Sequence, residues 1–375
     1  MKIMLQTIIN PDNDYIELDN WLRSRHAYRP LLVAGSSLSF LDISSHLRDL
    51  SDHGLDIIHF KEFRPNPSYE SIVSGVNVFR THQCDSIIAI GGGSAIDVAK
   101  CIRLFASLPG DGADGSWLKQ HFRPDDIPFL AMPTTAGSGS EATGSAVIYY
   151  QGEKQSVSDP ACLPETVLLD SSALRSLPDY QRRSTMMDAL CHALESFWAV
   201  NSTEESREYS GQAIRQIMAH MDAYLENTDE GNAGMLMAAH TAGKAINITK
   251  TTAGHAMCYK ITSLYGCAHG HAAAMCNRAI FPWMTENTDR CTDPRGKDYL
   301  ETIFRQIAEA MECDSAEAAA AKLDHIYESL DFQTPVVAPE EYEVLKASVN
   351  PARIQNHPIG MSIDDIDLMY HHILR

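Results

Sequence analysis

Cysteine pairs, basic residues and long apolar runs are all scarce in this 375-residue sequence. Its nine cysteines are an odd number and include no Cys-x-x-Cys pair, which argues against a disulfide framework and a structural zinc site. Basic residues number 30 against 49 acidic ones, and the net charge of -19 disfavours nucleic acid and anionic membranes as partners. No apolar run approaches the roughly 18 residues of a membrane span, and no signal peptide is recognisable. We therefore expect a cytoplasmic protein with reduced thiols.

The first half of the sequence alternates short apolar runs with amphipathic segments, which is typical of a parallel sheet covered on both faces. Helices are expected at 38–50, 67–81 and 95–104, and strands at 31–34, 57–60, 86–90, 129–132, 147–150 and 166–170. After Pro178 glycine becomes less frequent and long helical runs follow, such as 307–330. We predict a Rossmann-like α/β nucleotide-binding domain over residues 1–180 and an all-helical domain over residues 181–375.

Two loops rich in small residues follow strands of the expected sheet. Glycines allow a phosphate to approach the backbone, and a helix N-terminus behind them offers unpaired N–H groups. Two such loops at the strand ends of one sheet form the place where an open α/β fold binds a dinucleotide. The alternative is two ordinary polar connections. The candidate cofactor-binding residues are Gly91, Gly92, Gly93, Ser94, Asp97, Thr134, Thr135 and Ser138.

One carboxylate and three imidazoles make a candidate site for a divalent metal in the second half. Asp188 and His192 are four residues apart, so they share one face of a helix. His255 and His269 are separated by a helical segment and Gly266, and a turn at that glycine would return the second histidine to the first. Taken singly, the same motifs are compatible with a surface pair, a core histidine or a helix cap.

Four segments of the sequence, 91–100, 133–141, 188–195 and 255–270, resemble the iron-containing (group III) alcohol dehydrogenases. This resemblance covers nearly the whole chain. It implies a nucleotide domain, a helical metal domain and an active site in the cleft between them. It also implies Fe²⁺ or, as in some members, Zn²⁺ as the metal, with the ligands Asp188, His192, His255 and His269.

Segments 195–206, 243–252 and 255–263 are similar to the phosphonoacetaldehyde reductases, which reduce phosphonoacetaldehyde to 2-hydroxyethylphosphonate. This similarity implies a small anionic aldehyde as substrate, and the chain could form a homodimer. We assign Lys250 or Lys260, with Thr251 and Thr252, to the anion. A general small-alcohol dehydrogenase of the lactaldehyde or 1,3-propanediol type is the closer alternative. A dehydroquinate-synthase-like cyclase is the more distant one.

The sequence departs from the family pattern at two functional positions. Tyr259 stands where many members have a second histidine that helps to relay a proton, so this role is vacant or falls to Tyr259, His271 or water. After the first expected strand, Gly35 and Ser36 replace an aspartate that commonly holds the ribose hydroxyls of the cofactor. Without that carboxylate a 2′-phosphate is not repelled. NADPH is therefore expected as a cofactor, with NADH as the alternative.

Overall fold

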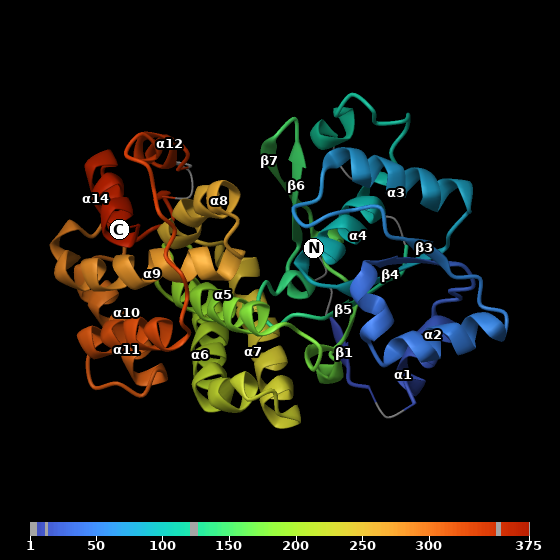
Figure 1. Cartoon of the computed structure of the whole chain (residues 1–375), viewed down its shortest axis with the longest axis horizontal. Helices are drawn as coiled ribbons and strands as arrows, with labels where there is room; N and C mark the ends of the chain where they lie inside the picture. The colour runs from blue at the N-terminus through green and yellow to red at the C-terminus, as the bar shows by residue number, and fades with distance from the viewer. Residues whose placement is uncertain (1–5, 12–13, 121–126, 350–353, 375) are drawn as a thin grey trace. The chain divides into compact units, whose positions relative to one another are not determined.

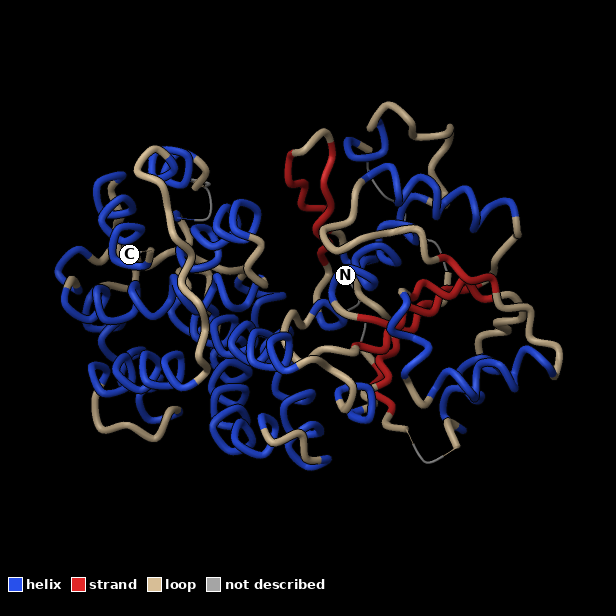
Figure 2. The backbone as a smooth tube through the Cα atoms, in the orientation of Figure 1, coloured by secondary structure: helices blue, strands red, loops and turns tan. Residues whose placement is uncertain are grey.

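The structure is a computed structural model that describes residues 6–11, 14–120, 127–349 and 354–374. The chain divides into two compact units, Met1–Leu177 and Pro178–Arg375. The division lies close to the boundary expected near residue 180. All strands of the described residues belong to the first unit, as Figure 2 shows.

A six-stranded parallel sheet forms the centre of the first unit, with the strand order β1-β8-β5-β4-β2-β3. The strands β2, β4, β5 and β8 are buried along their whole length, which explains their largely apolar sequences. The chain runs from β2 outward to β3 and then returns to the other side of β2 for β4, so the strand order reverses between β2 and β4. The bounds are β1 Thr7–Ile9, β2 Pro30–Ala34, β3 Ile58–Phe60, β4 Ser86–Gly91, β5 Phe129–Pro133 and β8 Thr166–Leu168.

Helices cover both faces of this sheet, as Figure 1 shows. Because side chains alternate along a strand, Leu31 and Val33 of β2 join the core beneath α3 and α4, whereas Leu32 and Ala34 join the core beneath α1 and α2. The helices are α1 Ile16–Ser24, α2 Ile43–Asp52, α3 Tyr69–Thr81 and α4 Gly93–Phe105. The predicted α/β domain is confirmed, although β1 and α1 were not expected from the sequence.

An antiparallel hairpin follows the loop after β5. Its strands β6 (Ser145–Tyr150) and β7 (Glu153–Ser158) are joined at Gln151 and Gly152, both of which have positive φ. Only the first of these strands was expected. Short 3-10 helices complete the unit: η1 Ser36–Phe40, η2 Ser116–Lys119, η3 Ser140–Ala142, η4 Pro160–Cys162 and η5 Ser171–Leu174.

The described part of the second unit is helical, which confirms the predicted all-helical domain. Helix α5 lies at its centre, packs against α6, α7 and α9, and buries nearly every side chain from Ser184 to Trp198. The helices are α5 Asp179–Trp198, α6 Glu204–Leu225, α7 Asp229–Thr249, α8 Ala253–Tyr265, α9 His269–Glu286, α10 Lys297–Ala310, α11 Ala316–Ser329, α12 Glu341–Ala347 and α14 Ile363–Ile373, with the short η6 at Thr288–Arg290.

The helical run expected over 307–330 is divided in the structure. Helix α10 ends at Ala310, Glu312 adopts a positive φ, and the Ser315 side chain caps the start of α11. A serine cap of this kind satisfies a free backbone N–H and begins a new helix. Among the described helices, none combines the length and the apolar character that a membrane crossing requires.

Candidate functional site

The two glycine-containing loops of the first unit lie against each other at the ends of neighbouring strands. The backbone N–H of Thr134 donates to the carbonyl of Gly91 at 3.0 Å. A Cβ atom added at Gly93 would lie only 2.8 Å from the hydroxyl oxygen of Ser138, so glycine permits this close approach. Because α4 starts at Gly93, its free N–H groups lie beside both loops and offer a site for phosphate.

The remaining cofactor candidates lie at the end of β2, next to β4 in the sheet. Gly35 is extended with φ -83° and ψ -169°, and Ser36 begins the exposed 3-10 helix η1. The reversal of strand order falls between these two strands, which is where open α/β sheets bind their ligands. The predicted cofactor-binding residues therefore lie together at the carboxyl ends of β2, β4 and β5. Ser94 also lies there, where its hydroxyl accepts from the backbone of Asn66 at 3.4 Å.

Asp97 has a supporting position rather than an open one. Its carboxylate accepts hydrogen bonds from the hydroxyl of Ser140 at 2.6 Å and from the backbone N–H of Val147 at 2.9 Å. Burial raises the pKa of Asp97, although the nearby Lys100 opposes this shift. The ammonium of Lys100 donates to Ser140, Thr143 and the carbonyl of Ser145, at distances from 2.6 to 3.0 Å. Asp97 and Lys100 therefore fix the loop after β5 to α4.

Replacing Lys100 by methionine should lower the stability of the first unit markedly. The ammonium is fully buried, and its removal leaves Asp97 and several oxygen acceptors without their cationic partner. Loss of one partner from such a buried network costs about 3–5 kcal/mol. Thermal unfolding checks this, with Lys119→Met, on the exposed end of η2, as the control. Equal melting temperatures for the two variants would contradict the role of Lys100.

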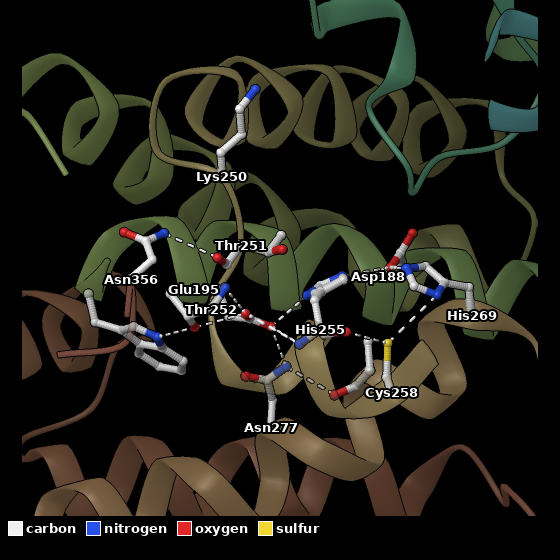
Figure 3. A network of polar contacts seen from close by, with 12 residues as sticks. Asp188, Glu195, Lys250, Thr251, Thr252, His255, Cys258, His269, Asn277 and Asn356 are labelled. Carbon is white, nitrogen blue, oxygen red and sulfur yellow. Dashed lines mark hydrogen bonds and ion pairs between the residues drawn. The ribbon is translucent and has the colours of Figure 1, made fainter. Parts of the chain in front are cut away.

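Three predicted metal ligands come together in the second unit. The Nε2 atoms of His255 and His269 lie 3.4 and 3.9 Å from the Oδ1 atom of Asp188. One donor atom from each of these residues lies within 4.8 Å of the others, as Figure 3 illustrates. They come from α5 and from the starts of α8 and α9, which are joined by a turn in which Gly266 is left-handed (φ 69°).

Glycine next to two of the ligands allows the helices to approach closely. A Cβ atom at Gly270 would lie 2.0 Å from the carbonyl oxygen of Ser184, and one at Gly254 would lie 2.3 Å from the amide of Asn277. Any larger residue would separate α9 or α8 from its neighbour and displace the adjoining histidine. These two contacts explain how three helices can present ligands to one point.

His192, the fourth predicted ligand, lies beside this group. It is buried one turn after Asp188 on α5, and its ring stacks on that of His255 with centroids 4.4 Å apart. Its Coulombic interaction helps to lower the pKa of Asp188. The structure thus places His192 next to the group of three, while the set that closes within 4.8 Å is formed by Asp188, His255 and His269.

The electrostatics of the group favour a bound cation. Burial opposes the charge of Asp188, but the three histidines outweigh it and hold its pKa well below the usual range. Burial also opposes a charged His255, yet Glu195 and Asp188 raise the pKa of this imidazole to about 9. A position that stabilises an imidazolium also stabilises a metal cation. A carboxylate with imidazole nitrogens is a donor set that Fe²⁺ and Zn²⁺ accept, so these residues fit the expected metal.

Glu195 is a site residue that the sequence reasoning did not assign. Its fully buried carboxylate accepts from Nδ1 of His255 at 2.5 Å, from the backbone N–H and hydroxyl of Thr252 at 2.6 and 2.8 Å, and from Asn277 at 2.8 Å. These contacts outweigh burial and lower the pKa of Glu195 to about 2. A carboxylate behind a metal-binding histidine fixes its orientation and tautomer. The spacing from Asp188, seven residues along the same helix face, was the available signal.

The predicted substrate threonines lie in the loop between α7 and α8. Thr252 is fully buried, and its hydroxyl donates to Glu195 and accepts from Trp198 at 3.0 Å, so this hydroxyl is used inside the protein. Thr251 is also buried. The side-chain amide of Asn356 donates to the carbonyl oxygens of Thr249 and Thr251 at 2.9 and 3.1 Å. The loop is therefore held from two sides.

The two candidate lysines differ in position. Lys250 is exposed, lies at the end of α7 and points away from the polar network in Figure 3. Lys260 is half-buried on α8, five residues after His255, which places it about 140° around the helix from that ligand. Of the two, only Lys250 belongs to the loop that carries Thr251.

The two candidates for the proton relay are also separated. The ring of Tyr259 stacks on that of His269 with centroids 5.5 Å apart, so this side chain lies beside the ligand group. His271 is buried, its ring nitrogens lie 3.0 and 3.2 Å from the hydroxyls of Tyr180 and Tyr327, and burial lowers its pKa to about 4. It lies about 200° around α9 from His269, on the opposite face.

Known proteins share this sequence pattern and fold. The family model for "Iron-containing alcohol dehydrogenase" matches residues 6–171, and that for "Fe-containing alcohol dehydrogenase family, C-terminal" matches residues 183–374. An NAD-dependent methanol dehydrogenase from Bacillus methanolicus is 26% identical over 360 residues, which cover 93% of each chain. A phosphonoacetaldehyde reductase from Streptomyces viridochromogenes is 27% identical over 311 residues, which cover 78% of each chain.

A solved structure supports the fold. The sulfoacetaldehyde reductase from Bifidobacterium kashiwanohense in complex with NAD+ superposes with a TM-score of 0.85 at 22% identity, covering 98% of this chain and 96% of that one. The two family models together match both units, and the predicted family resemblance is confirmed. The chain therefore belongs to the iron-containing alcohol dehydrogenase family and is an oxidoreductase of the alcohol dehydrogenase and aldehyde reductase class.

Proposed function

We propose that this enzyme reduces a small anionic aldehyde to the primary alcohol, with phosphonoacetaldehyde and 2-hydroxyethylphosphonate as the preferred pair. The observation that carries the proposal is the position and backbone of Lys250. This residue presents an exposed ammonium at the loop that leads into the ligand helix α8. The similarity to a phosphonoacetaldehyde reductase supports the same substrate class.

The backbone of Lys250 is strained. Its φ of 63° and ψ of -179° fall in a region that is occupied almost only by glycine. Such a conformation costs on the order of 1–3 kcal/mol and persists where the surrounding structure imposes it, often at a ligand-binding position. Here the loop is imposed by Glu195 and Asn356, which hold Thr252 and Thr251. A lysine in a position better suited to glycine is most simply explained by a need for its charge.

The residues of the second unit have distinct roles in the proposed reaction. A divalent metal would polarise the aldehyde oxygen, and a nicotinamide cofactor would supply the hydride. Asp188, His255 and His269, with His192 beside them, would hold the metal. Tyr259, whose ring stacks on that of His269, would give a proton to the product oxygen. The Lys250 ammonium would bind the anionic end of the substrate.

The proposed cofactor is NADPH or NADH, bound at the edge of the sheet formed by Gly35, Ser36 and the two loops. The exposed start of η1 carries serine hydroxyls in place of a carboxylate, so a 2′-phosphate meets no negative side chain there. Comparing kcat/KM for the two cofactors tests this part of the proposal separately from the substrate. A strong preference for NADH would contradict the expectation drawn from Gly35 and Ser36.

Replacing Lys250 by glycine should separate stability from substrate recognition. Relief of the backbone strain should raise the free energy of unfolding by about 1 kcal/mol. Loss of the ammonium should lower kcat/KM for phosphonoacetaldehyde by about 10- to 100-fold, the effect of one hydrogen bond to a charged group. The rate with uncharged acetaldehyde should stay within about twofold of wild type.

Lys260→Ala is the comparison variant for this experiment, because Lys260 lies on a different face of α8 from the predicted ligand His255. It should retain wild-type kcat/KM for phosphonoacetaldehyde. If Lys260→Ala were impaired and Lys250→Gly were not, the anion would belong to Lys260. If neither variant were selective for the anionic aldehyde, the proposed substrate class would be wrong.

A general small-alcohol dehydrogenase is the second candidate, and the similarity to a methanol dehydrogenase along most of the chain favours it. Such an enzyme would turn over lactaldehyde or 1,3-propanediol at least as well as phosphonoacetaldehyde. A cyclase that uses NAD only transiently would show no net oxidation of NAD(P)H. Rates measured at the nicotinamide absorbance band with these substrates separate the three functions.

A further inference from the structure

The two histidines that face Asp188 are held from behind by different kinds of side chain. His255 donates from Nδ1 to the carboxylate of Glu195 at 2.5 Å. The Nδ1 atom of His269 instead lies 3.7 Å from the thiol sulfur of Cys258, a buried residue of α8. We propose that Cys258 is the positioning residue of His269, and that its thiol makes His269 the weaker and more easily released metal ligand.

The hydrogen bonds around Cys258 determine the direction of the contact. The thiol hydrogen is directed to the backbone carbonyl of His255, one turn earlier on α8, at 3.4 Å. The sulfur lone pairs therefore remain to accept the Nδ1 hydrogen of His269. With the hydrogen on Nδ1, the lone pair of Nε2 faces Asp188, 3.9 Å away, as a metal ligand requires. Cys258 thus selects the tautomer of His269 that can bind the metal.

The carboxylate of Glu195 and the thiol of Cys258 support their histidines, His255 and His269, to different degrees. A carboxylate behind an imidazole increases its basicity, whereas a thiol is a weak and uncharged acceptor. Exposure adds to this difference, because the side chain of His269 is 38% exposed and that of His255 only 1%. His269 combines the weaker support with the better access to solvent. Metal release should therefore begin at His269, while His255 and Asp188 still hold the ion.

Two other buried cysteines lie near Cys258, and one of them, Cys276, supplies a matched control. Cys191 on α5 and Cys276 on α9 are also fully buried, and both interact electrostatically with Cys258. Among the described residues, Cys276 forms no hydrogen bond to His269 or another ligand. Cys276→Ala removes the same volume from the same region as Cys258→Ala, so it reports the effect of a cavity without the effect on His269.

The test measures the release of Zn²⁺ from the loaded full-length protein to an excess of chelator, followed with a zinc indicator. Cys258→Ala should release Zn²⁺ about 10- to 100-fold faster than wild type, the usual effect of removing a supporting partner of a ligand. The hydroxyl of Cys258→Ser can accept the same hydrogen, so this variant should release Zn²⁺ at a rate between those of wild type and Cys258→Ala. Cys276→Ala should stay within about twofold of wild type. Release from Cys258→Ala at the wild-type rate would overturn the proposal.

A spectroscopic measurement separates positioning from packing. In ¹⁵N-histidine NMR spectra of the Zn²⁺-loaded protein, His269 should show a protonated Nδ1 that exchanges slowly with water. The Cys258→Ala variant should lose this protection, whereas Cys276→Ala should retain it. An unchanged His269 signal in Cys258→Ala would show that the thiol does not fix the tautomer.

The inference rests on the metal centre of the proposed function. One further variant distinguishes an error in the position of that centre from an error in the role of Cys258. Asp188→Asn should lose Zn²⁺ regardless of Cys258. If Asp188→Asn retained Zn²⁺ like the wild type, the metal centre itself would be misplaced. If Asp188→Asn lost the metal and Cys258→Ala did not, only the role of Cys258 would be refuted.

Discussion

Asp188→Asn should abolish both metal binding and turnover. Asp188 is the only carboxylate in the group of three donors, and both His255 and His269 direct Nε2 toward it. Asparagine keeps the shape but removes the charge that balances the cation. Without the metal the transition state would lose several kcal/mol of stabilisation at the substrate oxygen. This loss corresponds to a decrease in kcat/KM of about a thousandfold or more. Metal content by atomic spectroscopy and steady-state rates check the two parts together.

Asp179→Asn provides the control for this prediction. Asp179 lies on the exposed first turn of the same helix, α5, so its loss changes the protein charge equally without touching the site. The control should keep wild-type metal content and activity. Near-normal turnover by a metal-free Asp188→Asn protein would refute the assignment of α5 to the catalytic centre.

Glu195→Gln should produce the second large effect, although Glu195 does not face the metal position directly. Its carboxylate accepts hydrogen bonds from His255, Thr252 and Asn277 in a fully buried place. A glutamine amide has one acceptor oxygen and presents hydrogen atoms to donors at its other end. His255 would lose its charged support, so metal affinity should fall by about 10- to 100-fold. Titration with Zn²⁺ in competition with an indicator measures this change.

The same substitution should also destabilise the second unit. Leaving a buried donor unsatisfied costs about 1–3 kcal/mol, so the melting temperature should decrease even without metal. Thr252→Val removes the hydroxyl donor and keeps the backbone N–H bond to Glu195, and it should therefore have a smaller effect on both measurements. A Glu195→Gln protein with wild-type metal affinity would show that the carboxylate only supports the fold.

The sequence indicated that the donor residues Asp188, His255 and His269 would lie together because local geometry determines much of their arrangement. Asp188 and His192 share a helix face by spacing alone, and Gly266 ends α8 where the turn was expected. The hydrogen-bond partners of Glu195 could not be predicted from local geometry. They lie 57, 60 and 82 residues further along the chain, in the loop before α8 and on α8 and α9, and only packing brings them to one carboxylate.

Side-chain direction explains the other differences between sequence and structure. His271 and Lys260 are close in sequence to predicted ligands but lie on other faces of their helices, so proximity in sequence did not indicate which way their side chains point. Thr252 has a hydroxyl suited to an anion, yet the buried Glu195 uses it. Strand β1 has only three residues, and its pairing with β8 cannot be recognised from so short an apolar run.

The contact of Asn356 with the loop between α7 and α8 has a consequence for protein synthesis. Asn356 holds the carbonyl of Thr249 from 107 residues further along the chain, and the hydroxyl of Tyr370 donates to the carbonyl of Met257 from 113 residues away. The first unit can fold while the ribosome is still translating the second. The loop between α7 and α8 can be held in this way only after residue 356 has been translated. A chain that stops before residue 356 would contain all four predicted metal ligands but would lack this contact.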